Sequence, residues 1–118
     1  MPFKFEKLEI WKLAVRFADE VHLLTRNFPR EEMFSLSSQF KRAADSISLN
    51  IAEGSIGQSN AEQRKFMGYA IRSLAECVTC LYLSEKRSYI AHERFIDFYN
   101  QSEELFAKMN KFRNNLVD

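Results

Sequence analysis

Residues 59–83 read SNAEQRKFMGYAIRSLAECVTCLYL, and this stretch decides the fold. It opens with Ser59 and Glu62 at the spacing of a capping box, in which each side chain bonds the other residue's backbone N–H at a helix start. Apolar residues then recur at the helical steps of three and four. They form two rows, which are Phe66, Ala70, Leu74, Cys77 and Leu81, and Met67, Ile71, Val78 and Tyr82. A helix that is apolar over so much of its girth is predicted to be buried on two sides, one against its own bundle and one against another subunit.

The sequence around this helix repeats the same period in three further pieces. Proline clashes with a continuing helix, so Pro29 is expected to end the first helix near Phe28. Ser35 is the expected N-cap of the second helix, Gly54 its left-handed C-terminal cap, and residues 87–89 a softer break before the fourth. The predicted apolar stripes are Leu8, Trp11, Val15, Ala18, Val21, Leu24 and Phe28 in residues 1–28; Leu36, Phe40, Ala43, Ile47 and Ile51 in 35–54; and Phe95, Phe98, Ser102, Leu105, Met109, Phe112 and Leu116 in 92–116. Four long helices with short links predict an all-α, up-down-up-down four-helix bundle, a single domain over residues 1–118.

The composition agrees with this fold class. The 118 residues include only three Gly and two Pro, which both disturb helix interiors. The net charge of +1, from 17 basic and 16 acidic residues, argues against a polybasic DNA-binding protein but leaves room for a local basic patch. The first residues contain no apolar run like that of a signal peptide, and no stretch is apolar over the length needed to span a membrane. We therefore expect a cytoplasmic protein with no membrane partner.

Motifs of catalysis and of metal binding are missing from the sequence. The Glu-x-x-His pairs of di-iron bundles, HExxH, GxxxxGK[ST] and GxGxxG are all absent. We therefore expect a protein that is not an enzyme and that has no cofactor and no metal site. Cys77 and Cys80 form a CxxC motif well inside a predicted helix, away from the helix N-terminus that lowers a thiol pKa, and no further zinc ligands are evident. These cysteines are expected to be buried and unreactive.

Pairs of adjacent basic residues, here called basic doublets, occur at residues 41–42, 64–65 and 86–87. They are interpreted in two ways: as solvated helix surface, which is common, or as a stripe that contacts phosphates. No quarter of the chain is strongly basic. Under the second interpretation, the candidate nucleic-acid-binding residues are Lys41, Arg64, Lys65, Lys86 and Arg87.

Polar residues also share faces on the two middle helices, close to the apolar rows. They are Arg42, Ser46, Asn50 and Glu53 on one helix, and Arg72 and Glu76 on the other. Unpaired buried polar groups are costly, so these residues are predicted to form a structural network that fixes helix register. A contact to a neighbouring subunit or ligand is the alternative. The antiparallel register places Arg42 and Glu76 within about one helical turn of each other, which predicts a direct ion pair.

A longer pattern of matching residues runs from residue 28 to residue 76, after an earlier match at residues 10–11. Its most specific part is residues 46–54, SISLNIAEG. The other matching residues are Ile10-Trp11, Phe28-Pro29, Glu31-Glu32, Phe34-Ser35-Leu36, Gln39, Arg42-Ala43-Ala44, Ser59, Phe66, Ala70, Ser73-Leu74 and Glu76. This pattern resembles a bacterial family of four-helix bundle proteins that are often encoded by intervening sequences inside large-subunit ribosomal RNA genes. The chain departs from many members at Leu49, where they carry Pro, and after Gly54, where they place an aromatic residue and an arginine.

The resemblance implies a four-helix bundle that assembles into a ring-like homopentamer with no established catalytic activity. It also implies similarity to the accessory protein of diversity-generating retroelements, a pentamer that binds nucleic acid and a reverse transcriptase. We therefore expect a non-enzymatic homo-oligomeric scaffold that binds RNA, DNA or a nucleic-acid enzyme. Two alternatives stay open: a protein-interaction module without nucleic-acid binding, and a small-molecule or enzymatic site around Asn50, Glu53, Arg72 and Glu76.

Overall fold

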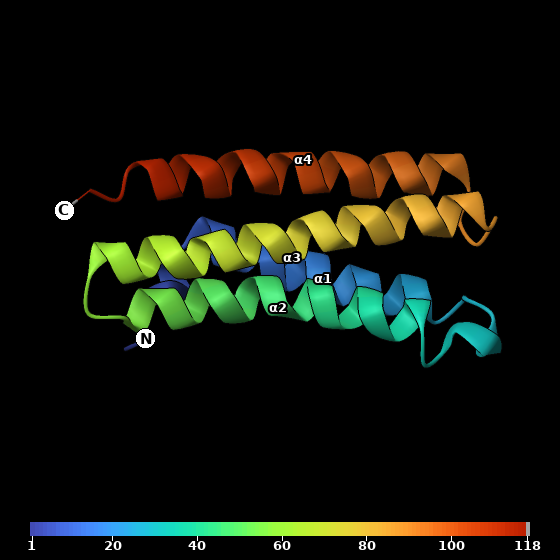
Figure 1. Cartoon of the computed structure of the whole chain (residues 1–118), viewed down its shortest axis with the longest axis horizontal. Coiled ribbons are helices and arrows are strands. Elements are labelled where there is room, and N and C mark those ends of the chain that lie inside the picture. The colour runs from blue at the N-terminus through green and yellow to red at the C-terminus, as the bar shows by residue number, and fades with distance from the viewer. Residues whose placement is uncertain (118) are drawn as a thin grey trace.

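The computed structural model describes residues 1–117, and within them the chain is helical with no strand. Its elements in chain order are the short 3₁₀ helix η1 (Lys4–Lys7), α1 (Glu9–Thr25), the 3₁₀ helix η2 (Arg30–Glu32), α2 (Leu36–Ile56), α3 (Asn60–Lys86) and α4 (His92–Asn114). The four long helices run alternately up and down the long axis (Figure 1). The predicted four-helix bundle is confirmed.

The bundle is elongated, with principal extents of 46 × 23 × 22 Å. The α1–α2 and α3–α4 links lie together at one end, here called the link end, whereas the α2–α3 link and both termini lie at the other (Figure 1). Helix α2 packs against α1 and α3, while α4 packs on α3 and less closely on α1. No helix within residues 1–117 is both long and apolar enough to cross a membrane.

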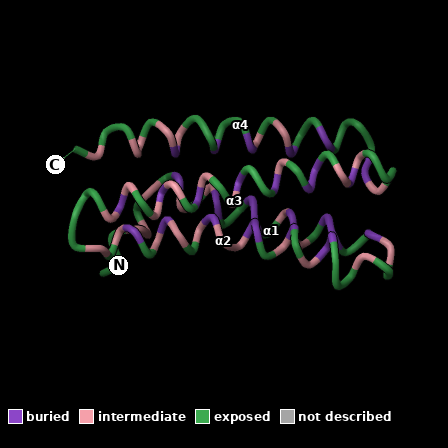
Figure 2. Tube along the Cα trace, viewed as in Figure 1, coloured by how far each residue is buried: buried purple, intermediate pink, exposed green. Residues whose placement is uncertain are grey.

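The buried side chains line the inner faces of the long helices (Figure 2). The predicted stripe of α2 is buried throughout, and that of α4 is buried from Phe95 to Met109. The stripe predicted for α1 is partly wrong, because Val15 is 42% exposed and the core instead receives Phe17 and its neighbours on that face. A helix with apolar residues on two adjacent faces can turn either one inward. Here η1 covers one of them, with the Phe5 ring 5.1 Å from the Trp11 ring.

Two of the predicted helix caps differ from the structure. Gly54 is not a left-handed cap: it lies inside α2, which continues to Ile56. A Cβ at this position would lie 2.8 Å from the Cβ of Phe66, so the glycine permits the close approach of α2 and α3. The Ser35 side chain makes no capping hydrogen bond, whereas Ser59 accepts one from the Glu62 N–H at 3.1 Å and caps α3 as predicted.

Candidate functional site

The basic doublets do not form one stripe. The Arg87 guanidinium donates to the Glu32 carboxylate at 3.1 Å, and the Arg64 guanidinium donates to the Leu116 carbonyl at 2.6 Å. The Lys65 ammonium lies 5.5 Å from the centre of the Phe66 ring. Each of these three cations therefore has a neighbour in the same chain, and their contact with phosphates stays a prediction.

Glu32 joins the two links at the link end. Its carboxylate accepts hydrogen bonds from the Ser35 hydroxyl at 2.7 Å and from the Tyr89 hydroxyl at 2.8 Å, besides the contact with Arg87. Ser35, then Tyr89, lower the pKa of Glu32 below its usual value, because these bonds stabilise the carboxylate. The Tyr89 ring also lies 5.3 Å from the Phe28 ring. This acid therefore fixes the link between α3 and α4 against the link between α1 and α2.

A hollow of about 400 Å³ lies between α2 and α3, here called the polar hollow. Ser46 lines it, and the Ser46 hydroxyl accepts from the Asn50 amide at 2.9 Å and from the Ser73 hydroxyl at 3.0 Å. The Asn50 amide also donates to the Ser46 carbonyl at 2.8 Å. The Ser73–Ser46 bond connects α3 to α2, so the structure contains part of the predicted network and adds Ser73 to it.

The charged residues that were predicted for that network are not bonded to one another. Arg42 and Glu76 line the polar hollow together, as their register predicts. Among the ion pairs of residues 1–117, however, none joins them, because both side chains are exposed and water can solvate each charge separately. Glu53 and Arg72 are exposed too and make no hydrogen bond or ion pair in the part of the chain described.

Cys77 and Cys80 are both buried and unpaired, as predicted. Burial raises the pKa of the Cys77 thiol, and it raises that of Cys80 to about 11, because a thiolate loses its hydration there. Neither is suited to be a nucleophile at neutral pH. Within residues 1–117, no three side chains of His, Cys, Asp or Glu are grouped so that they could hold a metal ion.

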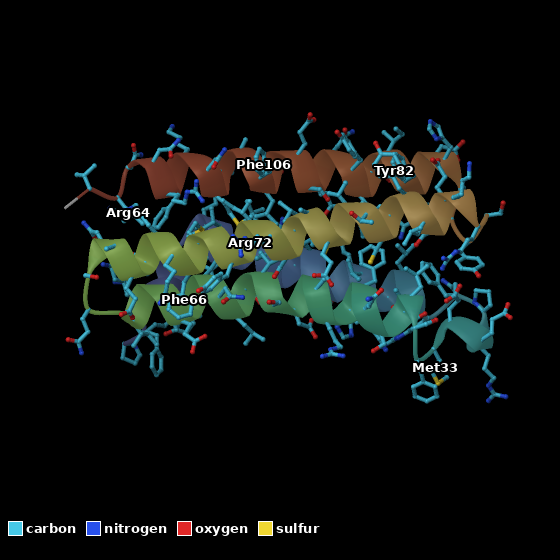
Figure 3. All side chains as sticks on the ribbon, viewed as in Figure 1. Met33, Arg64, Phe66, Arg72, Tyr82 and Phe106 are labelled. Carbon is cyan, nitrogen blue, oxygen red and sulfur yellow. The ribbon has the colours of Figure 1, made fainter. Side chains whose placement is uncertain are left out.

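The second apolar row of α3 forms a groove with α4 on the surface of the bundle, here called the apolar groove. It has a volume of about 320 Å³ and is lined from α3 by Ile71, Leu74, Ala75 and Val78, and from α4 by Tyr99, Ser102, Glu103 and Phe106. Phe106 is 46% exposed at its edge. Figure 3 shows Phe106 on α4 and Arg72 on α3. The predicted two-sided apolar helix is thus present, with its second side uncovered.

Aromatic rings extend the apolar groove toward the link end. The Tyr82 ring lies 4.9 Å from the Phe95 ring and 6.4 Å from the Tyr99 ring, both edge-on. Tyr82 is 54% exposed and continues the row of Val78 one turn along α3. Edge-to-face pairs hold rings in fixed orientations. The groove therefore ends in an ordered aromatic surface.

Sequence reasoning overlooked the role of Glu32 and that of Ser73. Both belong to the residue pattern of the family resemblance, but their partners lie 57 and 27 residues away, at Tyr89 and Ser46. Helical periodicity relates residues a few positions apart and carries no signal for such pairs.

Comparisons with known proteins agree with the fold. A family described as 23S rRNA-intervening sequence protein matches residues 6–111. A solved structure from Bacteroides thetaiotaomicron, a protein with unknown function from the S23 ribosomal protein family, is similar with a TM-score of 0.82 at 23% identity, covering 90% of this chain and 96% of that one. No curated protein matches the chain.

Proposed function

Because the chain belongs to the 23S rRNA-intervening sequence protein family, we propose that it acts as a homo-oligomeric helical scaffold that binds nucleic acid and has no catalytic activity. The apolar groove is the single observation that carries the proposal. Its exposed apolar side chains would be costly to leave in water, and an interface would remove them. A second copy of this chain is the proposed occupant.

The opposite side of the bundle offers side chains to fill the groove. Leu49 and Ile56 are 66% and 64% exposed on α2, and their spacing places them with Glu53 on one helix face. A contact between two different surfaces of identical subunits repeats from copy to copy and closes into a ring when the rotation allows it. The family resemblance suggests five subunits.

Nucleic acid is the proposed ligand because the resemblance implies similarity to a pentamer that binds nucleic acid and because basic side chains lie on the surface. A reverse-transcriptase-like enzyme on that nucleic acid is a further partner that the resemblance suggests. A ring would multiply each weak phosphate contact by the number of subunits, which raises the overall affinity through effective concentration.

Light scattering after size exclusion tests the assembly. We expect the wild-type protein at about 70 kDa, five times the chain mass of 13.9 kDa. Phe106→Asp should shift the mass toward 13.9 kDa, because a carboxylate would be buried in the interface. Met33→Asp is the matched control, since Met33 is also 46% exposed but lies at the link end. A wild-type mass of 13.9 kDa at micromolar concentration would refute the proposed oligomer.

Gel shift at two salt concentrations tests the ligand. Phosphate contacts release counter-ions, so the affinity should fall steeply as salt rises. No binding at low salt would remove nucleic acid from the proposal and leave a protein-interaction module. The exposed Phe34, Leu49 and Ile56 favour that second candidate, and a pull-down that survives nuclease treatment would support it.

The small-molecule or enzymatic alternative gains less support. The polar hollow is lined by Arg42, Ser46, Ser73 and Glu76, but Asn50, Glu53 and Arg72 are not among its lining residues. Of the four residues that define this alternative, only Glu76 therefore lines the polar hollow.

A further inference from the structure

A different hollow, of about 350 Å³, lies at the link end between α1 and the start of α2, and it is here called the cationic hollow. Its lining includes four basic side chains and no carboxylate. These basic residues are His22 and Arg26 from α1 and its C-cap, Arg30 from η2, and Lys41 from α2. They come from separate elements, so sequence spacing does not group them.

Most of the positive charge in the cationic hollow is uncompensated. Within residues 1–117, Arg26, Arg30 and Lys41 have no ion-pair partner, whereas His22 binds the Asp45 carboxylate at 2.9 Å. The carboxylate of Glu32 in the same link is already occupied by Ser35, Tyr89 and Arg87. Cations gathered in a concave surface concentrate their field and attract an anion.

The start of α2 adds to this field. Ser37 lines the cationic hollow and belongs to the first turn of the 21-residue helix α2. The Glu32 carboxylate accepts a hydrogen bond from the first N–H of α2, that of Leu36, at 3.4 Å. The N–H groups that follow it in the first turn have no partner inside the helix, and the helix dipole makes that end positive. Helix start and cations therefore favour the same kind of ligand, an anion such as a phosphate.

An exposed aromatic ring follows the lining directly. Met33 lines the cationic hollow, and Figure 3 places it at the link end. The next residue, Phe34, is 91% exposed. Proteins that bind single-stranded nucleic acid combine a positive groove for the backbone with aromatic rings on which bases stack. A duplex keeps its bases stacked inside and would leave Phe34 without a partner.

We propose that the cationic hollow binds a backbone phosphate of single-stranded nucleic acid, with Phe34 stacked on an adjacent base. This inference rests on the proposed nucleic-acid function and assigns it to a place. Lys41 is shared with the residues predicted from the sequence. Arg26, Arg30 and Phe34 are new.

Fluorescence anisotropy with a labelled single-stranded RNA of mixed sequence tests the assignment. The double variant Arg26→Gln/Arg30→Gln should bind this RNA about tenfold more weakly than wild type. The slope of log affinity against log salt concentration should also become shallower, by about 0.7 for each phosphate that the variant no longer binds. The control is Lys7→Gln/Lys12→Gln, which removes the same charge from exposed positions outside the hollow and should change affinity less than about twofold. Circular dichroism shows whether each variant keeps the helical fold.

Phe34→Ala separates nucleic acid from other polyanions. It should weaken RNA binding about tenfold, because the base stacking is removed, but leave the affinity for polyglutamate unchanged. An equal weakening for both polymers would overturn the stacking, and polyglutamate that displaces RNA as well as unlabelled RNA does would indicate an acidic protein partner instead.

The remaining outcomes distinguish this inference from the proposed function. Wild-type RNA binding that is unchanged in the hollow variant, or equally reduced in the control, overturns the cationic hollow and leaves the nucleic-acid function standing. A wild-type protein that binds no RNA at low salt overturns both.

Discussion

Replacing Gly54 with alanine tests how closely α2 and α3 approach. The added Cβ would lie 2.8 Å from the Cβ of Phe66 and 3.5 Å from the backbone of Gln63. Rotation of the Phe66 ring cannot relieve the first contact, because a Cβ is fixed to its own backbone. The two helices must therefore separate by several tenths of an ångström.

The expected magnitude is a difference between two terms. Alanine is favoured over glycine inside a helix by about 0.5–1 kcal/mol. Overpacking a well-filled contact costs about 1–3 kcal/mol. We expect Gly54→Ala to lower the free energy of unfolding by up to about 2 kcal/mol, which corresponds to roughly 4 °C in Tm per kcal/mol for a chain of this size.

Gly68→Ala is the matched control for this experiment. Gly68 lies inside α3, and a Cβ there would meet only the end of the Arg113 side chain, at 3.6 Å. The same helix propensity then acts without the steric term, so this variant should be more stable than wild type. Urea denaturation at one fixed protein concentration measures both, since stability would depend on concentration in a protein that assembles. If Gly54→Ala proves as stable as Gly68→Ala, the close contact does not limit packing and our reasoning is wrong.

Two further predictions concern ionisable groups. Cys77 and Cys80 should react with a thiol reagent at pH 7 only after denaturation. Burial raises the pKa of the Cys80 thiol to about 11 and that of the Cys77 thiol further. Rapid labelling of the native protein would contradict this prediction. Glu32→Gln should lower Tm at neutral pH. The pKa of Glu32 is lowered in the folded state, chiefly by the Ser35 hydroxyl, so its stabilisation is present above the unfolded value of about 4.5 and is lost as pH falls below it. The Tm difference between Glu32→Gln and wild type should therefore shrink in acid, and a difference that is constant with pH would exclude the carboxylate charge as its cause.

Helical periodicity was sufficient to predict the four helices and most of the core. It failed on α1, where Val15 is exposed and Phe17 is buried, because apolar residues lie on two adjacent faces and the period does not say which face turns inward. It also misjudged Gly54. A glycine near the end of a periodic stretch is typical of a helix cap. Only the position of α3 shows that Gly54 lies where no space is left for a side chain.

The candidate sites were harder to predict because they depend on how links fold. Arg87 was predicted as a surface cation, but the α3–α4 link brings it to Glu32, 55 residues earlier. Arg26 and Arg30 lie four residues apart on either side of Pro29, in a segment without a helical period. Such residues converge through the turn of the chain, which a pattern of apolar residues does not encode.

The placement of the chain ends gives the molecule a direction along its 46 Å axis. Both termini leave the bundle beside the α2–α3 link (Figure 1). Asn60 binds the carbonyl of Val117 there, and the residues that line the cationic hollow lie at the opposite end. A fluorescent protein or surface tether fused to either terminus would therefore project away from that hollow. Immobilised in this way, the molecule would present its cationic end to the surrounding solution.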